Sequence, residues 1–224
     1  MWFEDTQKQR RWNAGLKHLR RDPAMRKMIK KVGPCTLTPR RDYFIVLCKS
    51  IFTQQISTRI ATILFGRFCQ LFPRKKPTPK AVIDVLCHDH NAKHCGLSRQ
   101  KRAYLLDLAK HFAEGEIPTR RIAAMSDDEI IECLTRVKGV GRWTAEMFLI
   151  FVLNRPDVWP VDDLGLREGV RVAFDLPERP GAKALLELGE RFRPHRTLVT
   201  WYLWRYLGLQ LAKTSSAKRR SGAR

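Results

Sequence analysis

Apolar residues recur every three or four positions along most of this chain, which is the spacing of one face of an α-helix. A clear case follows Asp42, where the positions i, i+3, i+4 and i+7 are Phe44, Leu47, Cys48 and Ile51. No stretch alternates apolar and polar residues over the length of a strand. The pattern therefore predicts an all-α protein without a sheet.

Capping residues, prolines and glycines divide this pattern into separate helices. We expect helices over residues 5–20, 22–33, 42–55, 59–72, 98–112, 126–134, 142–153, 164–174, 181–192 and 195–211, with a further helix starting at Thr78. Ser126 and Glu129 are spaced as a capping box, in which each side chain binds the other residue's backbone N–H. The helix over 195–211 is apolar nearly all round, so it should be buried.

Cysteine and histidine are frequent between Cys87 and Cys95, which raises the question of a zinc site. The segment has no C-x-x-C pair, and its histidines are not spaced as in common structural zinc sites. We therefore expect a polar loop and no metal. The six cysteines of the chain lack the spacing of a disulfide framework, so we expect reduced thiols, mostly buried.

Length and charge narrow the classes of protein. With 224 residues the chain can bury a proper core in one large or two small helical lobes. Lys and Arg number 43 against 22 acidic residues, a net charge of +21, which favours a polyanionic partner. Ribosomal or ribonucleoprotein binding would explain this charge equally well. The hydrophobic fraction of 44% excludes a disordered tail protein.

The N-terminus lacks the apolar segment of a signal peptide, and no run of eighteen apolar residues occurs. We therefore expect a soluble, intracellular protein that has no contact with a membrane. Its compartment would be the cytoplasm or nucleoid, or the nucleus in a eukaryote.

The most informative stretch runs from Leu134 to Asp163. Gly139 and Gly141 are spaced for a tight turn whose backbone N–H groups can approach a ligand closely. The turn opens onto a helix that starts at Arg142, so the positive end of the helix dipole lies at the same place. This arrangement suits a phosphate.

Two carboxylates, Asp162 and Asp163, follow a Trp-Pro-Val run and precede an apolar helix. Either aspartate alone would be interpreted as a helix cap. A phosphate-binding turn a short distance before them favours a functional role for one of the two.

These motifs, L-x-x-V-K-G-V-G-R-W-T-A and D-V-W-P-V-D-D-L-G-L, resemble the helix-hairpin-helix DNA glycosylase superfamily and its 3-methyladenine DNA glycosylase II branch. Further matches extend over nearly the whole chain. They are Gly33-Pro34, the segment 50–57, Gly96-Leu97-Ser98 with Lys101, and Arg193-Pro194-His195-Arg196 ahead of Trp201 and Trp204.

The resemblance implies two helical lobes with an active-site cleft between them. Residues 35–154 would form a central domain that ends in the hairpin motif at 134–145. Residues 1–34 and 155–212 would form the second lobe, followed by a basic, disordered tail over 213–224.

The resemblance also assigns site residues. Asp163 matches the superfamily's catalytic aspartate, and Asp162 is the alternative if the register shifts by one. The phosphate-binding residues would be Lys138, Gly139, Val140, Gly141, Arg142 and Thr144. Trp143 and Trp204 match base-pocket positions of the related family. Trp159 is a further candidate because an indole can stack on a cationic base, and Met147 is also expected in the pocket. Gln55, with Gln54 as the alternative, would fill the space left by an extruded nucleotide, although neutral amides at a helix end are more often ordinary caps.

Two departures from related branches refine the expected activity. Members that also nick the DNA strand carry a lysine where this chain has Trp143, and without that amine no Schiff base forms. The iron-sulfur branch has four closely spaced cysteines near its C-terminus, whereas the last cysteine here is Cys133. We expect a monofunctional, cofactor-free, monomeric enzyme that acts on damaged bases in double-stranded DNA. A non-catalytic DNA-binding module, or a glycosylase for oxidised or mismatched bases, remains the alternative.

Overall fold

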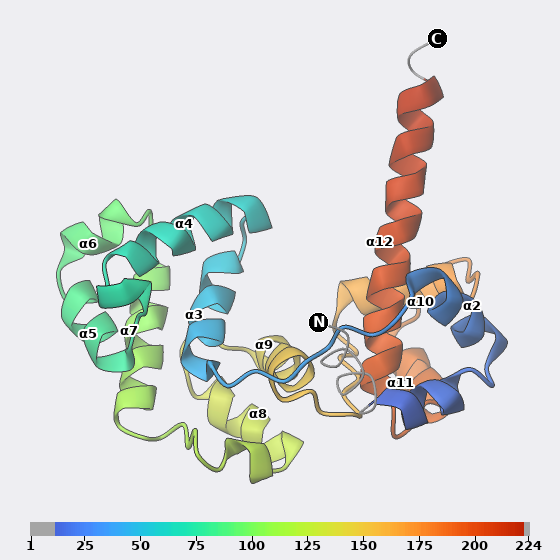
Figure 1. The fold of residues 1–224 in the computed structure, drawn as a ribbon, viewed down its shortest axis with the longest axis horizontal. Coiled ribbons are helices and arrows are strands. Elements are labelled where there is room, and N and C mark those ends of the chain that lie inside the picture. The colour runs from blue at the N-terminus through green and yellow to red at the C-terminus, as the bar shows by residue number, and fades with distance from the viewer. Residues whose placement is uncertain (1–11, 222–224) are drawn as a thin grey trace. The chain divides into compact units, whose positions relative to one another are not determined.

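The computed structural model describes residues 12–221, which form two compact units. Pro39–Leu153 form one, which we call the inserted unit because it interrupts the other in sequence. Met1–Thr38 and Asn154–Arg224 form the terminal unit. Among residues 12–221 there are helices and no strands, which confirms the predicted all-α class (Figure 1).

The inserted unit contains most of the helices. In chain order they are α3 (Tyr43–Thr53), α4 (Thr58–Gln70), the 3₁₀ turn η1 (Pro73–Lys75), α5 (Pro79–Leu86), α6 (Asp89–His94), α7 (Arg99–Ala113), the 3₁₀ turn η2 (Ile122–Ala124), α8 (Asp127–Thr135), α9 (Arg142–Phe148) and the π-helical segment η3 (Leu149–Leu153). Helix α7 packs against both α3 and α5, so it lies at the centre of this unit.

Side-chain caps fix where several of these helices begin. The side chains of Ser57, Thr78 and Ser98 accept backbone N–H groups at the starts of α4, α5 and α7. Ser126 and Glu129 form the predicted capping box of α8. Asp42 precedes α3 as expected, but its carboxylate pairs with Arg40 and makes no cap hydrogen bond.

The terminal unit is built from both ends of the chain. It contains a helix over residues 12–19, α2 (Pro23–Val32), α10 (Leu164–Ala173), α11 (Ala182–Glu190) and α12 (Arg196–Ser221). Helix α12 packs against α2 and α10 (Figure 1). Its first turns are buried, with Leu198, Val199, Tyr202 and Leu203 inaccessible to solvent. The prediction of burial over 195–211 is wrong for the second half of that range, where Leu209 and Leu211 are exposed.

Three sequence expectations need revision. Residues 89–94, expected as a polar loop, form the short helix α6. Residues 149–153 are π-helical instead of continuing the α-helix from Arg142. The tail expected to be disordered from residue 213 continues α12 to Ser221, because its Ala, Lys and Arg residues have good helix propensity. Residues 5–11 of the first expected helix and 222–224 of the tail lie outside the described residues.

A membrane span would need a long, apolar helix. No helix within the part of the chain that the structure describes combines that length and hydrophobicity.

Candidate active site

The hairpin turn, residues 136–141, connects α8 to α9 in the inserted unit. Gly139 lies at its tip with φ +82°, in the region that favours glycine. A Cβ atom added to Gly139 would lie 2.2 Å from Cδ2 of Tyr104, because the Tyr104 ring packs against the backbone there. Both the dihedral angle and the packing therefore require glycine at this position.

Some backbone N–H groups of the turn donate hydrogen bonds within the protein, and others lie at the start of α9. The Val140 N–H donates to Val137 O (3.0 Å), and the Lys138 N–H donates to Oδ2 of Asp107 (2.8 Å). The first intrahelical bond of α9 runs from Ala145 N to Gly141 O. The amides of Gly141 and Arg142 lie before this bond, so they have no acceptor within the helix. Both residues are exposed.

This geometry revises the set of predicted phosphate-binding residues. The Val140 amide is used inside the turn, and its side chain is buried. The Thr144 side chain is also buried, so neither side chain is presented to solvent. The side chain of Lys138 is 74% exposed, with Nζ 3.8 Å from Oδ1 of Asp107, and it remains available to an anion.

Arg142 and Trp143 form the exposed start of α9. Nε of Arg142 lies 3.2 Å from Oε1 of Glu146, one turn further on, and the Glu146 residue is buried. The Trp143 side chain is half exposed, and Met147 lies one turn after it on the same face of the helix. An exposed tryptophan beside a basic turn can stack on a planar, cationic group.

The α3–α4 corner, residues 54–57, holds the two glutamines that were candidates for the wedge. Nε2 of Gln54 donates to the carbonyl oxygen of Gly139 (2.8 Å), so this side chain is used to bind the hairpin turn. Gln55 is exposed and has φ +58°, which is uncommon for a residue with a side chain. Of the two glutamines, Gln55 is therefore the exposed one, and Gln54 is engaged with the hairpin turn.

Asp163 caps α10 in the terminal unit. Its Oδ1 accepts hydrogen bonds from the Leu166 backbone N–H and from Nε1 of Trp204 (2.8 Å), so the carboxylate is fixed by two donors. A Cβ atom added to Gly165 would lie 3.1 Å from Oδ1 of Asp163 and 3.2 Å from Nε1 of Trp204. The lack of a side chain at Gly165 allows this close approach.

Asp162 has a different environment. Its side chain is 74% exposed and pairs with Nη2 of Arg167 at 3.3 Å. Nε of Arg167 also donates to the Val161 carbonyl, which holds the guanidinium beside the turn. Of the two neighbouring aspartates, Asp163 is the one held against an aromatic residue, and Asp162 is a surface ion-pair partner.

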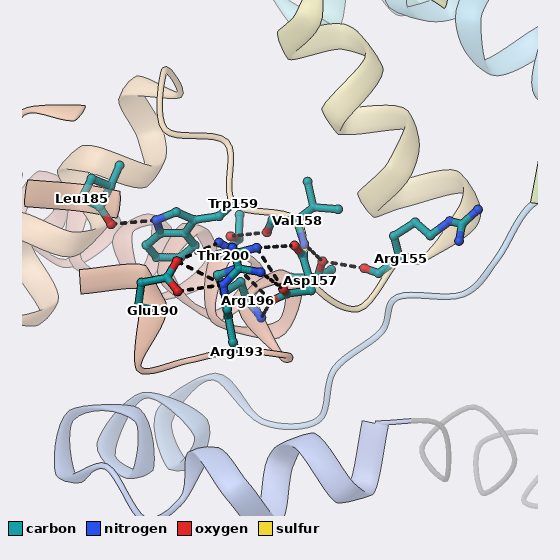
Figure 2. A network of polar contacts seen from close by, with 10 residues as sticks. Arg155, Asp157, Val158, Trp159, Leu185, Glu190, Arg193, Arg196 and Thr200 are labelled. Carbon is teal, nitrogen blue, oxygen red and sulfur yellow. Dashed lines mark hydrogen bonds and ion pairs between the residues drawn. The ribbon is translucent and has the colours of Figure 1, made fainter. Parts of the chain in front are cut away.

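Trp159 was expected in the base pocket, but it is a core residue of the terminal unit. Only 7% of its surface is exposed, and Nε1 donates to the Leu185 carbonyl at 2.8 Å (Figure 2). Its ring packs so closely on Gly189 that an added Cβ there would lie 2.6 Å away. The face and the N–H of this indole are therefore both occupied within the protein.

A polar network fixes the segment that leads to Asp163 (Figure 2). The Arg196 guanidinium binds the Asp157 carboxylate through Nε (2.8 Å) and Nη2 (2.9 Å), and Arg193 adds a third bond. The Val158 N–H donates to Oγ1 of Thr197, also in the first turn of α12. Because α12 also carries Trp204, the network sets the position of the Asp163 segment relative to that indole.

Three residues on α7 hold the candidate site in ways that the sequence did not predict: Tyr104 and Asp107 contact the hairpin turn, and Lys101 contacts the end of α3. Their contacts join residues 31 to 49 positions apart in the sequence, and no local motif predicts such contacts. Among the described residues no group of three His, Cys, Asp or Glu side chains is placed to hold a metal ion.

Comparison with known proteins agrees with this geometry. Residues 48–194 match the HhH-GPD superfamily of base excision DNA repair proteins, where HhH denotes the helix-hairpin-helix motif. The chain is 36% identical over 189 residues to DNA-3-methyladenine glycosylase 1 of Schizosaccharomyces pombe, and the match covers 82% of each chain.

Solved structures give the same result. A 3-methyladenine DNA glycosylase from Schizosaccharomyces pombe, in complex with abasic DNA, matches 86% of this chain and 95% of its own, with TM-score 0.74 and 35% identity. A DNA-3-methyladenine glycosidase from Bacillus halodurans matches 84% of this chain and 86% of its own, with TM-score 0.75 and 31% identity. The resemblance found in the sequence is confirmed, and the chain belongs to the HhH-GPD superfamily of base excision DNA repair proteins.

Proposed function

We propose that this protein is a DNA glycosylase that hydrolyses the N-glycosidic bond of alkylated purines, such as 3-methyladenine, in double-stranded DNA. Several relatives that cover most of the chain are named as DNA-3-methyladenine glycosylases or glycosidases. The observation that carries the proposal is the Asp163 carboxylate, held at the N-terminus of α10 by Nε1 of Trp204. In a DNA-binding module without catalysis the same carboxylate would serve only as the N-cap of α10.

Asp163 supplies the chemistry in this proposal. Breaking a purine N-glycosidic bond develops positive charge on the sugar, and a fixed carboxylate stabilises that charge or orients the attacking water. Fixed donors matter because a carboxylate that is already oriented needs little reorganisation during the reaction. An alkylated purine already carries positive charge, so it leaves readily and needs little acid catalysis.

In this proposal the hairpin turn binds the DNA backbone. The amides of Gly141 and Arg142 at the start of α9 and the exposed Lys138 ammonium belong to the same turn, and we assign them to a phosphate of the DNA backbone. Phosphate contacts set register but carry no base identity. The net charge of +21 adds to the attraction for the duplex.

A base inside a duplex must be swung out before it can react. We assign Gln55 as the residue that fills the space left behind, because it is exposed at a corner with an uncommon backbone conformation. Such a conformation costs roughly 1–3 kcal/mol and is often kept at functional sites. Trp143, Trp204 and Met147 would contact the extruded base, with the indoles stacking on its cationic ring.

Trp143 also determines whether the DNA strand is cut after the base is released. It occupies the position at which strand-nicking relatives carry a lysine, and an indole forms no Schiff base with the sugar. The product would be an intact strand with an abasic site. We expect the enzyme to act on DNA as a monomer, within the cellular compartment that holds the DNA.

The direct test is release of free bases from methylated DNA, separated by chromatography. Undamaged duplex of the same sequence serves as the substrate control, and the Asp163→Asn variant serves as the enzyme control. We expect 3-methyladenine to be released by the native protein only. Tight binding to DNA without release of any base would replace this proposal by that of a non-catalytic module.

A further inference from the structure

Helix α7 contacts both elements to which the proposed function assigns contact with DNA. Lys101, Tyr104 and Asp107 follow one another at intervals of three residues, so they lie along one side of the helix. Lys101 contacts the end of α3, Tyr104 contacts Gly139, and Asp107 binds the backbone of Lys138. One helix therefore serves as the common support of the α3–α4 corner and the hairpin turn.

Lys101 closes the end of α3. Its Nζ donates to the carbonyl oxygens of Phe52 and Gln54, at 2.8 Å each. The last carbonyls of a helix have no intrahelical donor, and an ammonium at that end also complements the helix dipole. Burial lowers the pKa of Lys101, so the side chain has given up part of its hydration to make these bonds. The backbone is thereby fixed one residue before Gln55.

Gln54 joins that corner directly to the hairpin turn. Its backbone carbonyl is held by Lys101, while its side-chain amide donates to the carbonyl of Gly139 at 2.8 Å. The contact spans 85 residues of sequence. At the preceding residue of the turn, the Lys138 N–H donates to the Asp107 carboxylate at 2.8 Å. Two consecutive residues of the turn are thus held by side chains from other elements.

We propose that Gln54 and Lys101 are positioning residues that hold the wedge residue Gln55 and the phosphate-binding turn at a fixed spacing. Binding of the DNA backbone by the turn and extrusion of the nucleotide then occur together. The inference rests on the proposed function and adds to it the residues that couple its two DNA-contacting elements. Neither residue touches the reacting bond, so their loss leaves the hydrolytic step intact and impairs extrusion.

The test compares two substrates that differ only in the cost of extrusion. Both carry the same alkylated purine, in one case opposite its normal partner and in the other opposite an abasic-site analogue, where no base pair must be broken. Excision is measured in a single turnover with enzyme in excess. The variants are Gln54→Glu, which keeps the size of the side chain but sets a carboxylate against the Gly139 carbonyl, and Lys101→Met, which removes the ammonium.

We expect Gln54→Glu and Lys101→Met to excise the paired base about tenfold more slowly, the effect of losing one or two hydrogen bonds. Both variants should process the unpaired base at the native rate. Lys110→Met removes an exposed lysine from the same helix and should leave the ratio of the two rates unchanged. If Lys101→Met does not fold, as judged by circular dichroism, Gln54→Glu carries the test alone.

Two outcomes overturn the inference. One is an equal loss on both substrates, which indicates a general structural or catalytic role. The other is an unchanged rate on both. Failure of the proposed function is a distinct result, because the native protein would then release no base from either substrate.

Discussion

Nε1 of Trp204 lies 2.8 Å from Oδ1 of Asp163, in contact with the carboxylate to which we assign the chemistry. We predict that Trp204→Phe, which keeps an aromatic ring and loses the donor, lowers the single-turnover rate by about tenfold or more, since a hydrogen bond to a charged group contributes about 1.5–3 kcal/mol. Affinity for lesion-containing DNA should change little. Trp201→Phe removes an indole from the same helix without touching Asp163, and it should retain the native rate.

Asp163 and Asp162 can be separated by matched substitutions. Asp163→Asn keeps the shape of the side chain and removes its charge, so we predict loss of turnover with retained binding to lesion-containing DNA. Asp162→Asn breaks only an exposed ion pair with Arg167 and should remain active, because exposed pairs contribute about 0–1 kcal/mol. Base release and binding are measured for both. The reverse pattern would show that the catalytic position lies one residue earlier.

Gly139 and Gly115 both have positive φ, +82° and +78°. A Cβ atom added at Gly139 would clash with Tyr104, whereas one added at Gly115 would have no atom within 4 Å. Ala at position 115 should therefore cost only the dihedral strain, about 1–2 kcal/mol. Gly139→Ala adds a clash with the Tyr104 ring, which should lower the free energy of unfolding by about 1–3 kcal/mol more and displace the turn. Urea unfolding measures the difference, and only Gly139→Ala should also weaken binding to DNA. Equal costs at the two sites would contradict the packing described for the turn.

The product of the reaction tests the role of Trp143. We predict an intact strand with an abasic site, which breaks only after alkali or a separate lyase is added. Borohydride should trap no covalent complex between the protein and abasic DNA. A trapped complex that disappears in Lys138→Ala would show that an amine of the hairpin turn reaches the sugar. The enzyme would then still be a glycosylase, with strand-nicking activity in addition.

Glu168 makes the stability of the terminal unit depend on pH. Hydrogen bonds from Arg171, and then from Arg179, lower the pKa of its carboxyl from 4.5 to about 2. The folded pKa lies below the unfolded one, so this stabilisation is present above about pH 4.5 and is lost as the pH falls towards 2. Glu168→Gln should lower the melting temperature at pH 7, with a gap to the native protein that narrows below pH 4.5. Glu187→Gln, at an exposed position on α11, is the control.

Local signals in the sequence account for much of the fold. The capping box of Ser126 and Glu129 and the caps at Thr78 and Ser98 are short-range features, and the structure contains each of them. The apolar first turns of α12 were recognisable for the same reason. The π-helical turn at 149–153 carried no such signal, because the same apolar residues suit either kind of helix.

The candidate site was predictable only in part, since its contacts join distant residues. The glycines of the hairpin turn can be recognised locally. The Gln54 side chain could be assigned only as a wedge or an ordinary helix cap, and its bond to Gly139 was not predicted. Trp159 and Trp204 look alike in sequence. Gly189 packs beneath the first and Gly165 beside the second, and these neighbours decide which indole is core and which meets Asp163.

The terminal unit is assembled from the two ends of the chain, and this arrangement has a consequence for synthesis on the ribosome. Oη of Tyr202 donates to the carbonyl of Gly33, 169 residues earlier. The inserted unit, Pro39–Leu153, is translated in full before α12 emerges, so it can fold first. Until then α2 lacks α12, the helix against which it packs. Met25 and Met28 of α2 are fully buried in the finished protein. A chain that terminates before α12 would therefore expose the apolar face of α2 to chaperones and proteases.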